Sequence, residues 1–272
     1  MHPSPALLAP ALALLLPVTA SAQGRAIEMA YEVSVAGFNG FVIDLVARFD
    51  GDRYIVDTNS YKIGVLRMLT ARYGGRNRAW GTLSDEGARP AGGSIAVENR
   101  DTLRCWEVRY DGSRVAHEVH DPNYTPKPEH EIADSDKTGS FDPLTAGFHL
   151  AFARDACERP IPIFDGRRRI DILVKRVGTE PARDAAIEGA RGDAVICEVT
   201  SRRVAGEFQA ARPETERQPP RPLRAWLAHL DSSNARYIAR LEADTGFGTL
   251  RGRVTRFRER AFTDEDRAAM GR

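Results

Sequence analysis

The stretch IEMAYEVSV, residues 27–35, carries a large apolar side chain at every second position. Because successive side chains of a β-strand point to opposite faces, this alternation predicts a strand with one buried face. The same period recurs in FVIDLVARF, residues 41–49, and again after the turn Asp50-Gly51, a favoured hairpin signal. The first third of the chain is therefore predicted to be an antiparallel meander.

The rest of the chain keeps the same rhythm. Turn residues recur about every 8 to 12 positions, a spacing typical of an antiparallel sandwich or barrel. Hairpin-length loops dominate, so the sheet is predicted to be antiparallel and to form one β domain over residues 23–272. Further strands are predicted at residues 78–83, 93–98, 106–110, 114–120, 169–177, 193–203, 223–230, 235–243 and 249–257.

Two apolar segments depart from this period. Asp142 and Pro143 precede LTAGFHLAFARDA, whose large apolar residues recur at helical spacing. Asp is a favoured N-cap and Pro is favoured at the first helical position, so a helix is predicted to begin there. Residues 63–72, IGVLRMLTAR, form either a short second helix or a hydrophobic loop.

Two polar segments are predicted to be exposed, mobile loops. Residues 121–138 are rich in Pro and acidic side chains, and residues 212–222 are rich in Pro and charge. Neither carries the apolar residues that would hold it against a core. Neither is interpreted as a domain linker, because the strands on both sides share the same alternation.

The N-terminal residues have the pattern of an export signal. The apolar run LLAPALALLLPV, residues 7–18, is followed by Ala20-Ser21-Ala22, a small-x-small cleavage site. This order is typical of a secretory signal peptide, and the run is shorter than the ~20 apolar residues of a membrane span. We therefore expect residues 1–22 to be removed by cleavage after Ala22, and we expect no membrane span.

Three cysteines remain in the exported chain: Cys105, Cys157 and Cys197. In an oxidising compartment two of them are expected to pair. Cys105 lies beside Trp106 on a strand of its own and is interpreted as a buried thiol. Metal binding is the alternative for all three, but no CxxC or Cys/His pair at ligand spacing supports it.

Charge and motifs exclude several functional classes. The 39 basic and 38 acidic residues alternate and leave a formal charge of +1, which gives no patch for nucleic acid. His117 and His120 resemble a metal pair, but on a strand they point to opposite faces. No nucleophile elbow, zinc-protease helix, phosphate loop or dinucleotide fingerprint is found. The chain is therefore interpreted as non-enzymatic, with no catalytic residue, metal or cofactor.

A set of motifs occurs between residues 142 and 197: Asp142-Pro143-Leu144, Cys157, IPIFDGRRR at residues 161–169, Gly192-Asp193-Ala194 and Cys197. Together they resemble exported bacterial proteins catalogued as domain of unknown function 3108. The resemblance implies a periplasmic, mainly β protein, built as a strongly curved antiparallel sheet or open β-barrel with one helix packed against it. It also implies a disulfide between Cys157 and Cys197, and it implies no catalytic residue.

The leading functional hypothesis is a monomeric envelope protein that binds a hydrophobic ligand or an envelope partner on the curved sheet. A carrier of this kind needs a continuous apolar cavity of ~300 Å³ or more, whereas a packed core leaves none. The alternatives are an interaction scaffold without a small ligand and a glycan- or ester-acting hydrolase. The candidate cavity-lining residues, for which ordinary core packing is the alternative, are Leu66, Met68, Leu69, Phe148 and Phe152.

Overall fold

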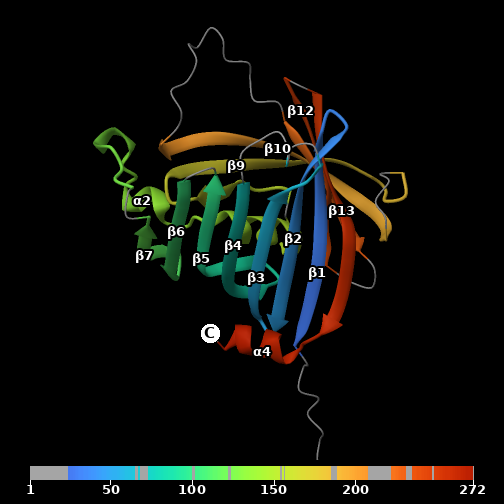
Figure 1. Ribbon diagram of the computed structural model, residues 1–272, viewed down its shortest axis with the longest axis horizontal. Helices are drawn as coiled ribbons and strands as arrows, with labels where there is room; N and C mark the ends of the chain where they lie inside the picture. Colours follow the sequence, from blue (N-terminus) through green and yellow to red (C-terminus); the bar gives the residue numbers. More distant parts are fainter. Residues whose placement is uncertain are drawn as a thin grey trace, which may run out of the picture.

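The strands of the computed structural model form one 13-stranded sheet in which every neighbouring pair is antiparallel (Figure 1). The structure describes residues 24–64, 67, 73–99, 102–121, 124–153, 155, 157–184, 189–207, 222–230, 235–246 and 248–271. The strands are β1 Arg25–Val35, β2 Phe38–Asp50, β3 Arg53–Lys62, β4 Tyr73–Ser84, β5 Gly87–Asn99, β6 Thr102–Asp111, β7 Arg114–His120, β8 Ile161–Phe164, β9 Arg168–Pro181, β10 Ala190–Gly206, β11 Leu223–Leu230, β12 Arg236–Thr245 and β13 Gly248–Ala261. The helices are η1 Pro128–His130, α2 Asp134–Lys137, α3 Pro143–Phe152 and α4 Asp264–Met270.

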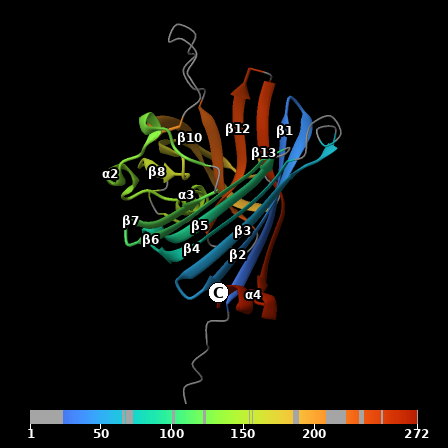
Figure 2. The same ribbon diagram turned by 60° about the vertical axis from the view of Figure 1, so that its left-hand side comes forward.

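The chain begins in the middle of the sheet and returns to it. Strands β1 to β7 follow one another to one edge, and β8 to β13 run back from the other edge to the centre. There β13 pairs with β1, with Ile27 opposite Glu259, so the two halves of the sheet join between the first and last strands (Figures 1 and 2). The predicted mainly β fold with a curved antiparallel sheet is therefore confirmed.

Strand pairing does not close the sheet into a barrel. Its edges are β7 and β8, and the segment before α3 crosses between them. Gly139 N–H donates to the carbonyl of Ser113 at 2.7 Å, and Phe141 pairs with Ile163 of β8. This segment ties the two edges together without making them neighbours.

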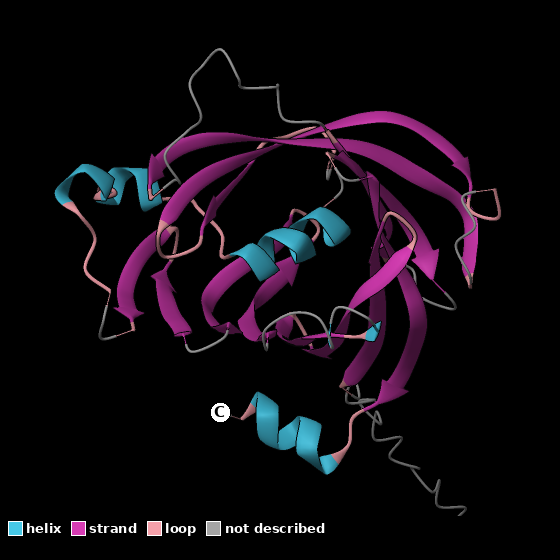
Figure 3. Cartoon of the chain, turned by 45° about the horizontal axis from the view of Figure 1, so that its top comes forward, coloured by secondary structure: helices cyan, strands magenta, loops and turns pink. Residues whose placement is uncertain are grey.

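The predicted helix is present as α3, and it lies across the concave face of the sheet (Figure 3). Asp142 is its N-cap and Pro143 its first residue, as the local sequence predicts. On its inner side Phe148 stacks on Tyr54 at 5.4 Å between ring centroids. The large apolar residues of IEMAYEVSV that precede the bulge at Ala30/Tyr31 point to this same face, which makes the helix and the alternating strand one core.

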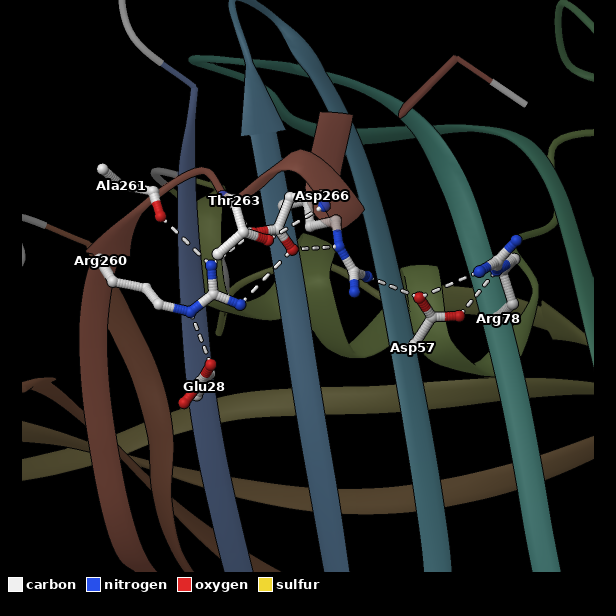
Figure 4. A network of polar contacts seen from close by, with 8 residues as sticks. Glu28, Asp57, Arg78, Arg260, Ala261, Thr263 and Asp266 are labelled. Atoms are coloured by element: carbon white, nitrogen blue, oxygen red, sulfur yellow. Dashed lines mark hydrogen bonds and ion pairs between the residues drawn. The ribbon is translucent and has the colours of Figure 1, made fainter. Parts of the chain in front are cut away.

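Helix α4 packs against the outer face of the sheet, near the start of β1. A series of ion pairs fixes it there (Figure 4). Asp266 is the central acceptor, since Arg48 Nε donates to it at 2.8 Å and Arg260 donates to it from the other side. The series crosses β1, β13, α4, β2, β3 and β4 in the order Glu28, Arg260, Asp266, Arg48, Asp57 and Arg78.

Most of the described residues of the polar segment 121–138 are exposed, as predicted, but the segment is not without structure. It contains η1 and α2, and Ile132 between them is buried against Trp106 and Phe164. Polar contacts also tie the segment to the sheet, since Lys137 donates to Glu118 of β7 and Arg169 of β9 donates to the carbonyl of Asp136. Residues 212–221 of the second predicted loop, and most of the apolar segment 63–72, lie outside the described residues.

Candidate functional site

An apolar pocket lies between α3 and the concave face of the sheet. Its volume is about 160 Å³, and β1, β2, β12 and α3 form its walls. From β1 come the inward-facing residues of the alternating stretch, and from α3 come residues of its first two turns. These wall residues are Ile27, Met29, Tyr31, Leu144, Gly147 and Phe148.

The pocket opens to solvent at one end and closes on the core at the other. Ile27 and Met29 are buried, whereas Tyr31, Leu45 and Leu144 are only partly covered. Burial, reinforced by the neighbouring phenol of Tyr237, raises the pKa of Tyr31 far above its usual value. The Tyr31 hydroxyl therefore stays neutral even in alkaline solution, and it lies 4.0 Å from the sulfur of Met29.

The size of the pocket limits what it can hold. An apolar cavity of about 150 Å³ stays dry and accepts a benzene-sized group. A complete drug-sized ligand needs ~300 Å³ or more. The described walls thus fit one ring or the end of one hydrocarbon chain, which is less than the cavity that the sequence hypothesis required.

Of the five candidate cavity residues from the sequence, the structure describes two. Phe148 lines the pocket, whereas Phe152 lies one turn further along α3 and packs edge-on against Tyr237 at 5.8 Å. Phe148 belongs to the buried core with Phe49, and the partly buried Phe152 packs against that core. The other three candidates lie outside the described residues: Leu66, Met68 and Leu69.

The candidate cavity residues named from the sequence include none of the wall residues that the sheet supplies. Alternation marks Tyr31 and Leu45 as inward-facing, but it does not say that β1 and β2 lie opposite this part of α3. That placement depends on the non-local pairing of β13 with β1. The sequence does not mark Gly147 as a pocket residue, because a glycine within a helix is as compatible with a packed position as with an open one.

A buried polar cluster anchors the start of α3 beside the pocket. Asp142 Oδ1 accepts hydrogen bonds from the N–H groups of Leu144 and Thr145, each at 3.0 Å, while Oδ2 is buried without a partner in the described part of the chain. Burial raises the pKa of Asp142 to about 6. The Tyr54 hydroxyl and Thr145 Oγ1 lie 2.8 Å apart. A Cβ at Gly93 would lie 2.9 Å from the Asp142 carboxyl carbon, so this close approach requires glycine.

The disulfide implied by the resemblance is present. Cys157 and Cys197 are bonded with their Cα atoms 5.8 Å apart, so the segment after α3 is tied to β10. Cys105, in contrast, is not the buried thiol that was expected. Trp106 points into the core, so the preceding residue on the strand points outward, and the Cys105 thiol is partly exposed.

The histidines of β7 form no metal pair. His120 shares its face with Glu118, and the two side chains are 2.6 Å apart. Within the residues that the structure describes, no group of three or more His, Cys, Asp or Glu side chains is placed to hold a metal ion. Among the same residues, no helix has the length and apolar character needed to cross a membrane.

Comparison with known proteins assigns a family to this architecture. No curated protein and no solved structure matches the chain. One family model, described as a protein of unknown function (DUF3108), matches residues 29–255. The match begins in β1 and ends in β13, so it spans the whole sheet, α3 and the pocket, and it ends before α4. The chain therefore belongs to the DUF3108 family of proteins of unknown function.

Proposed function

We propose that this protein is an exported envelope protein that binds an apolar group in the pocket between α3 and the sheet. The observation that carries the proposal is a preformed pocket with buried apolar residues at its base and partly exposed ones at its mouth. Covering an apolar wall with a hydrocarbon group lowers the free energy by roughly 25 cal/mol per Å² of apolar surface removed from water. The group that fits is one ring or the end of one acyl chain.

Binding of an apolar group is favoured over a pure interaction scaffold. A scaffold would present a contiguous exposed apolar patch. Among the described residues, the exposed large apolar side chains lie on six different strands: Phe38, Tyr61, Leu103, Val119, Val177 and Val204. Single exposed apolar residues of this kind are normal on protein surfaces and need no partner.

The same geometry supports binding rather than catalysis. Asp142 is the buried carboxyl nearest the pocket, and its raised pKa is of the kind that a general acid has. Its hydrogen bonds, however, go to the first N–H groups of α3, as those of an N-cap do. The Thr145 hydroxyl is engaged by Tyr54. These contacts support a role in holding the helix.

Export to the periplasm completes the proposal. The N-terminal run with its small-x-small site is the signal that supports secretion. The Cys157–Cys197 bond supports an oxidising compartment, since cytosolic proteins rarely keep such bonds. We expect the mature protein to begin at Gln23.

Filling the pocket from the helix tests the proposal. No atom lies within 4 Å of the position that a Cβ on Gly147 would occupy, so a larger side chain can enter the pocket without a clash at its base. We expect Gly147→Phe to reduce binding of toluene, a single-ring probe of the size that the pocket fits, at least ~10-fold, the loss of about 1.4 kcal/mol. Titration of the protein with toluene, followed by the chemical shifts of the protein in NMR spectra, measures this loss.

A matched control and an endogenous ligand complete the test. Gly178 of β9 also faces open space and lies outside the pocket lining, so Gly178→Phe should leave probe binding unchanged. Native mass spectrometry of protein purified from the envelope should show added mass from an apolar ligand, and Gly147→Phe should remove it. Equal probe binding by the two variants would overturn the proposal.

A further inference from the structure

A second cavity lies on the opposite face of the sheet, in a groove between α4 and strands β3 to β6. Its volume is about 600 Å³. Trp80 and Arg78 face it, because they alternate along β4 with Ala79, which is buried in the core on the concave side. Ala269 of α4 forms one wall. The polar wall residues used below are Arg53, Arg78, Ser94, Glu107 and Arg109.

Trp80 gives the groove a flat apolar floor. Gly92 is its partner on β5, and a Cβ there would lie only 2.1 Å from Cζ2 of the indole. The ring therefore occupies the space above Gly92, which another side chain would fill. Trp80 remains partly exposed, and its indole N–H has no hydrogen bond within the described part of the chain.

The rim of the groove carries excess positive charge. Arg78 makes two hydrogen bonds to Asp57, and Arg109 is paired with Glu107 at 3.1 Å. Arg53 differs, because its recorded bond goes to the main-chain carbonyl of Met270 at 3.0 Å, and among the described residues no carboxylate pairs with it. The end of α4 thus positions a guanidinium that has donors to spare.

We infer that this groove binds an acidic sugar, a pyranose ring that carries a carboxylate. One face of a pyranose presents C–H groups, which are attracted to the negative face of an indole ring. The hydroxyl groups around the ring match Ser94, Glu107 and the indole N–H. A guanidinium with free donors binds a carboxylate through paired hydrogen bonds, which assigns the acidic group to Arg53.

This inference goes beyond the proposed function and is independent of it. The groove lies on the outer face and the apolar pocket on the concave face, with the sheet between them. The volume of the groove is within the usual range for small-molecule sites, roughly 300 to 1,000 Å³. A failure at one site therefore leaves the other unaffected, and variants in each can be tested with the other ligand.

The groove can be tested with two sugars that differ only in a carboxylate group. Isothermal titration of the full mature chain with methyl β-D-glucuronide should show binding with a Kd on the order of 1 mM or tighter, and methyl β-D-glucoside should bind at least ~10-fold more weakly. Trp80→Ala should abolish both signals, and Trp80→Phe, which keeps an aromatic floor, should restore part of them. Arg53→Gln should make the two sugars bind equally.

Controls separate loss of the site from loss of the fold. Arg258 is an exposed arginine on β13, outside the groove, so Arg258→Gln should keep the preference for the acid. Each folded variant should keep the far-ultraviolet circular dichroism spectrum and the urea midpoint of the unaltered chain. The inference is overturned if neither sugar binds the folded protein, if Trp80→Ala binds as the unaltered chain does, or if Arg53→Gln keeps the full preference.

Discussion

Two buried aspartates hold the two main helices to opposite faces of the sheet, and they differ in their partners. Asp142 at the start of α3 and Asp266 in the first turn of α4 are 2% and 1% exposed. Asp142 accepts from main-chain N–H groups, and no ion pair to it is recorded within the described chain. Asp266 accepts from Arg48 and Arg260 as well as from Thr263. Burial raises the pKa of Asp142 to about 6, whereas the guanidinium of Arg260, with Thr263 and Arg48, holds the pKa of Asp266 far below its usual range against the opposing effect of burial.

The difference shows that charge partners, and not burial alone, decide the state of a buried carboxyl. The concave face supplies apolar side chains, so α3 is held mainly by packing. Burying the carboxyl of its N-cap, Asp142, costs desolvation free energy. The outer face carries alternating charged residues, so α4 is held by ion pairs around one carboxylate. One sheet therefore offers an apolar pocket beside α3 and a polar groove beside α4.

Removing the carboxylate of Asp266 on the outer face should have the largest effect on the free energy of unfolding. Asp266→Ala leaves Arg48 and Arg260 partly buried without their shared acceptor, and breaking a buried pair in this way costs about 3 to 5 kcal/mol. Urea unfolding followed by circular dichroism measures the change. The matched control is Asp264→Ala in the same helix, whose side chain is exposed and pairs with Arg267, and which should change stability by less than ~1 kcal/mol.

The pH dependence of the Asp266 variant gives an independent check. A carboxyl whose folded pKa is depressed stabilises the protein above its unfolded pKa, near 3.9, and loses that contribution as the pH falls toward the folded value. The stability difference between the unaltered protein and Asp266→Ala should therefore be constant at neutral pH and shrink below about pH 4. A difference that stays constant down to pH 2 would contradict the role given to the ion pairs.

The contribution of Asp142 to stability should change with pH in the opposite sense, and the change should be smaller than the loss expected for Asp266→Ala. Its folded pKa is raised to about 6, so its contribution is fully present below the unfolded pKa and is lost as the pH rises to about 6. Asp142→Asn keeps an N-cap but does not titrate. Relative to the unaltered protein, the variant should gain about 2 to 3 kcal/mol between pH 4 and pH 7.

The measurement for Asp142 is a pair of stability curves against pH. The side-chain amide that Asp142→Asn buries beside Gly93 lowers the stability of the variant by the same amount at every pH. It therefore does not alter how stability changes with pH. Parallel curves for the two proteins would show that the pKa of Asp142 is the same in the folded and the unfolded state, against the effect assigned to burial. The contrast between the two faces would then be lost.

Local signals in the sequence predicted the strands and α3, but they did not predict how the sheet is assembled. Asp142-Pro143 marks the start of α3 because N-cap and first-turn preferences act over a few residues. The pairing of β1 with β13, with its bulge at Ala30/Tyr31, depends on contacts between the two ends of the chain. Helix α4 was missed although Thr263 and Asp266 form a capping box, because the helix has a single short turn of apolar residues.

The candidate site was predictable only in part, for the same reason. Phe148 could be assigned to the inner side of α3 from helical spacing alone. The opposite walls come from β1, β2 and β12, which meet α3 only once the assembled sheet curves around it. The outer groove was missed entirely, since nothing in the local sequence indicates that Trp80 and Arg53 flank the same helix end.

The smallest effect on stability should come from Gly147→Ala, which adds one methyl group to α3. Gly147 faces the pocket, and no atom lies within 4 Å of where its Cβ would be. Gly147→Ala should therefore stabilise the protein by about 0.5 to 1 kcal/mol, because alanine is the better helix former and restricts the unfolded chain. A single methyl group leaves most of the pocket open, so probe binding should fall by less than ~3-fold, well short of the loss expected for Gly147→Phe. Destabilisation on adding this methyl group would mean that the inner side of α3 is packed at this position, and the contrast between an open pocket beside α3 and a tightly held α4 would then fail.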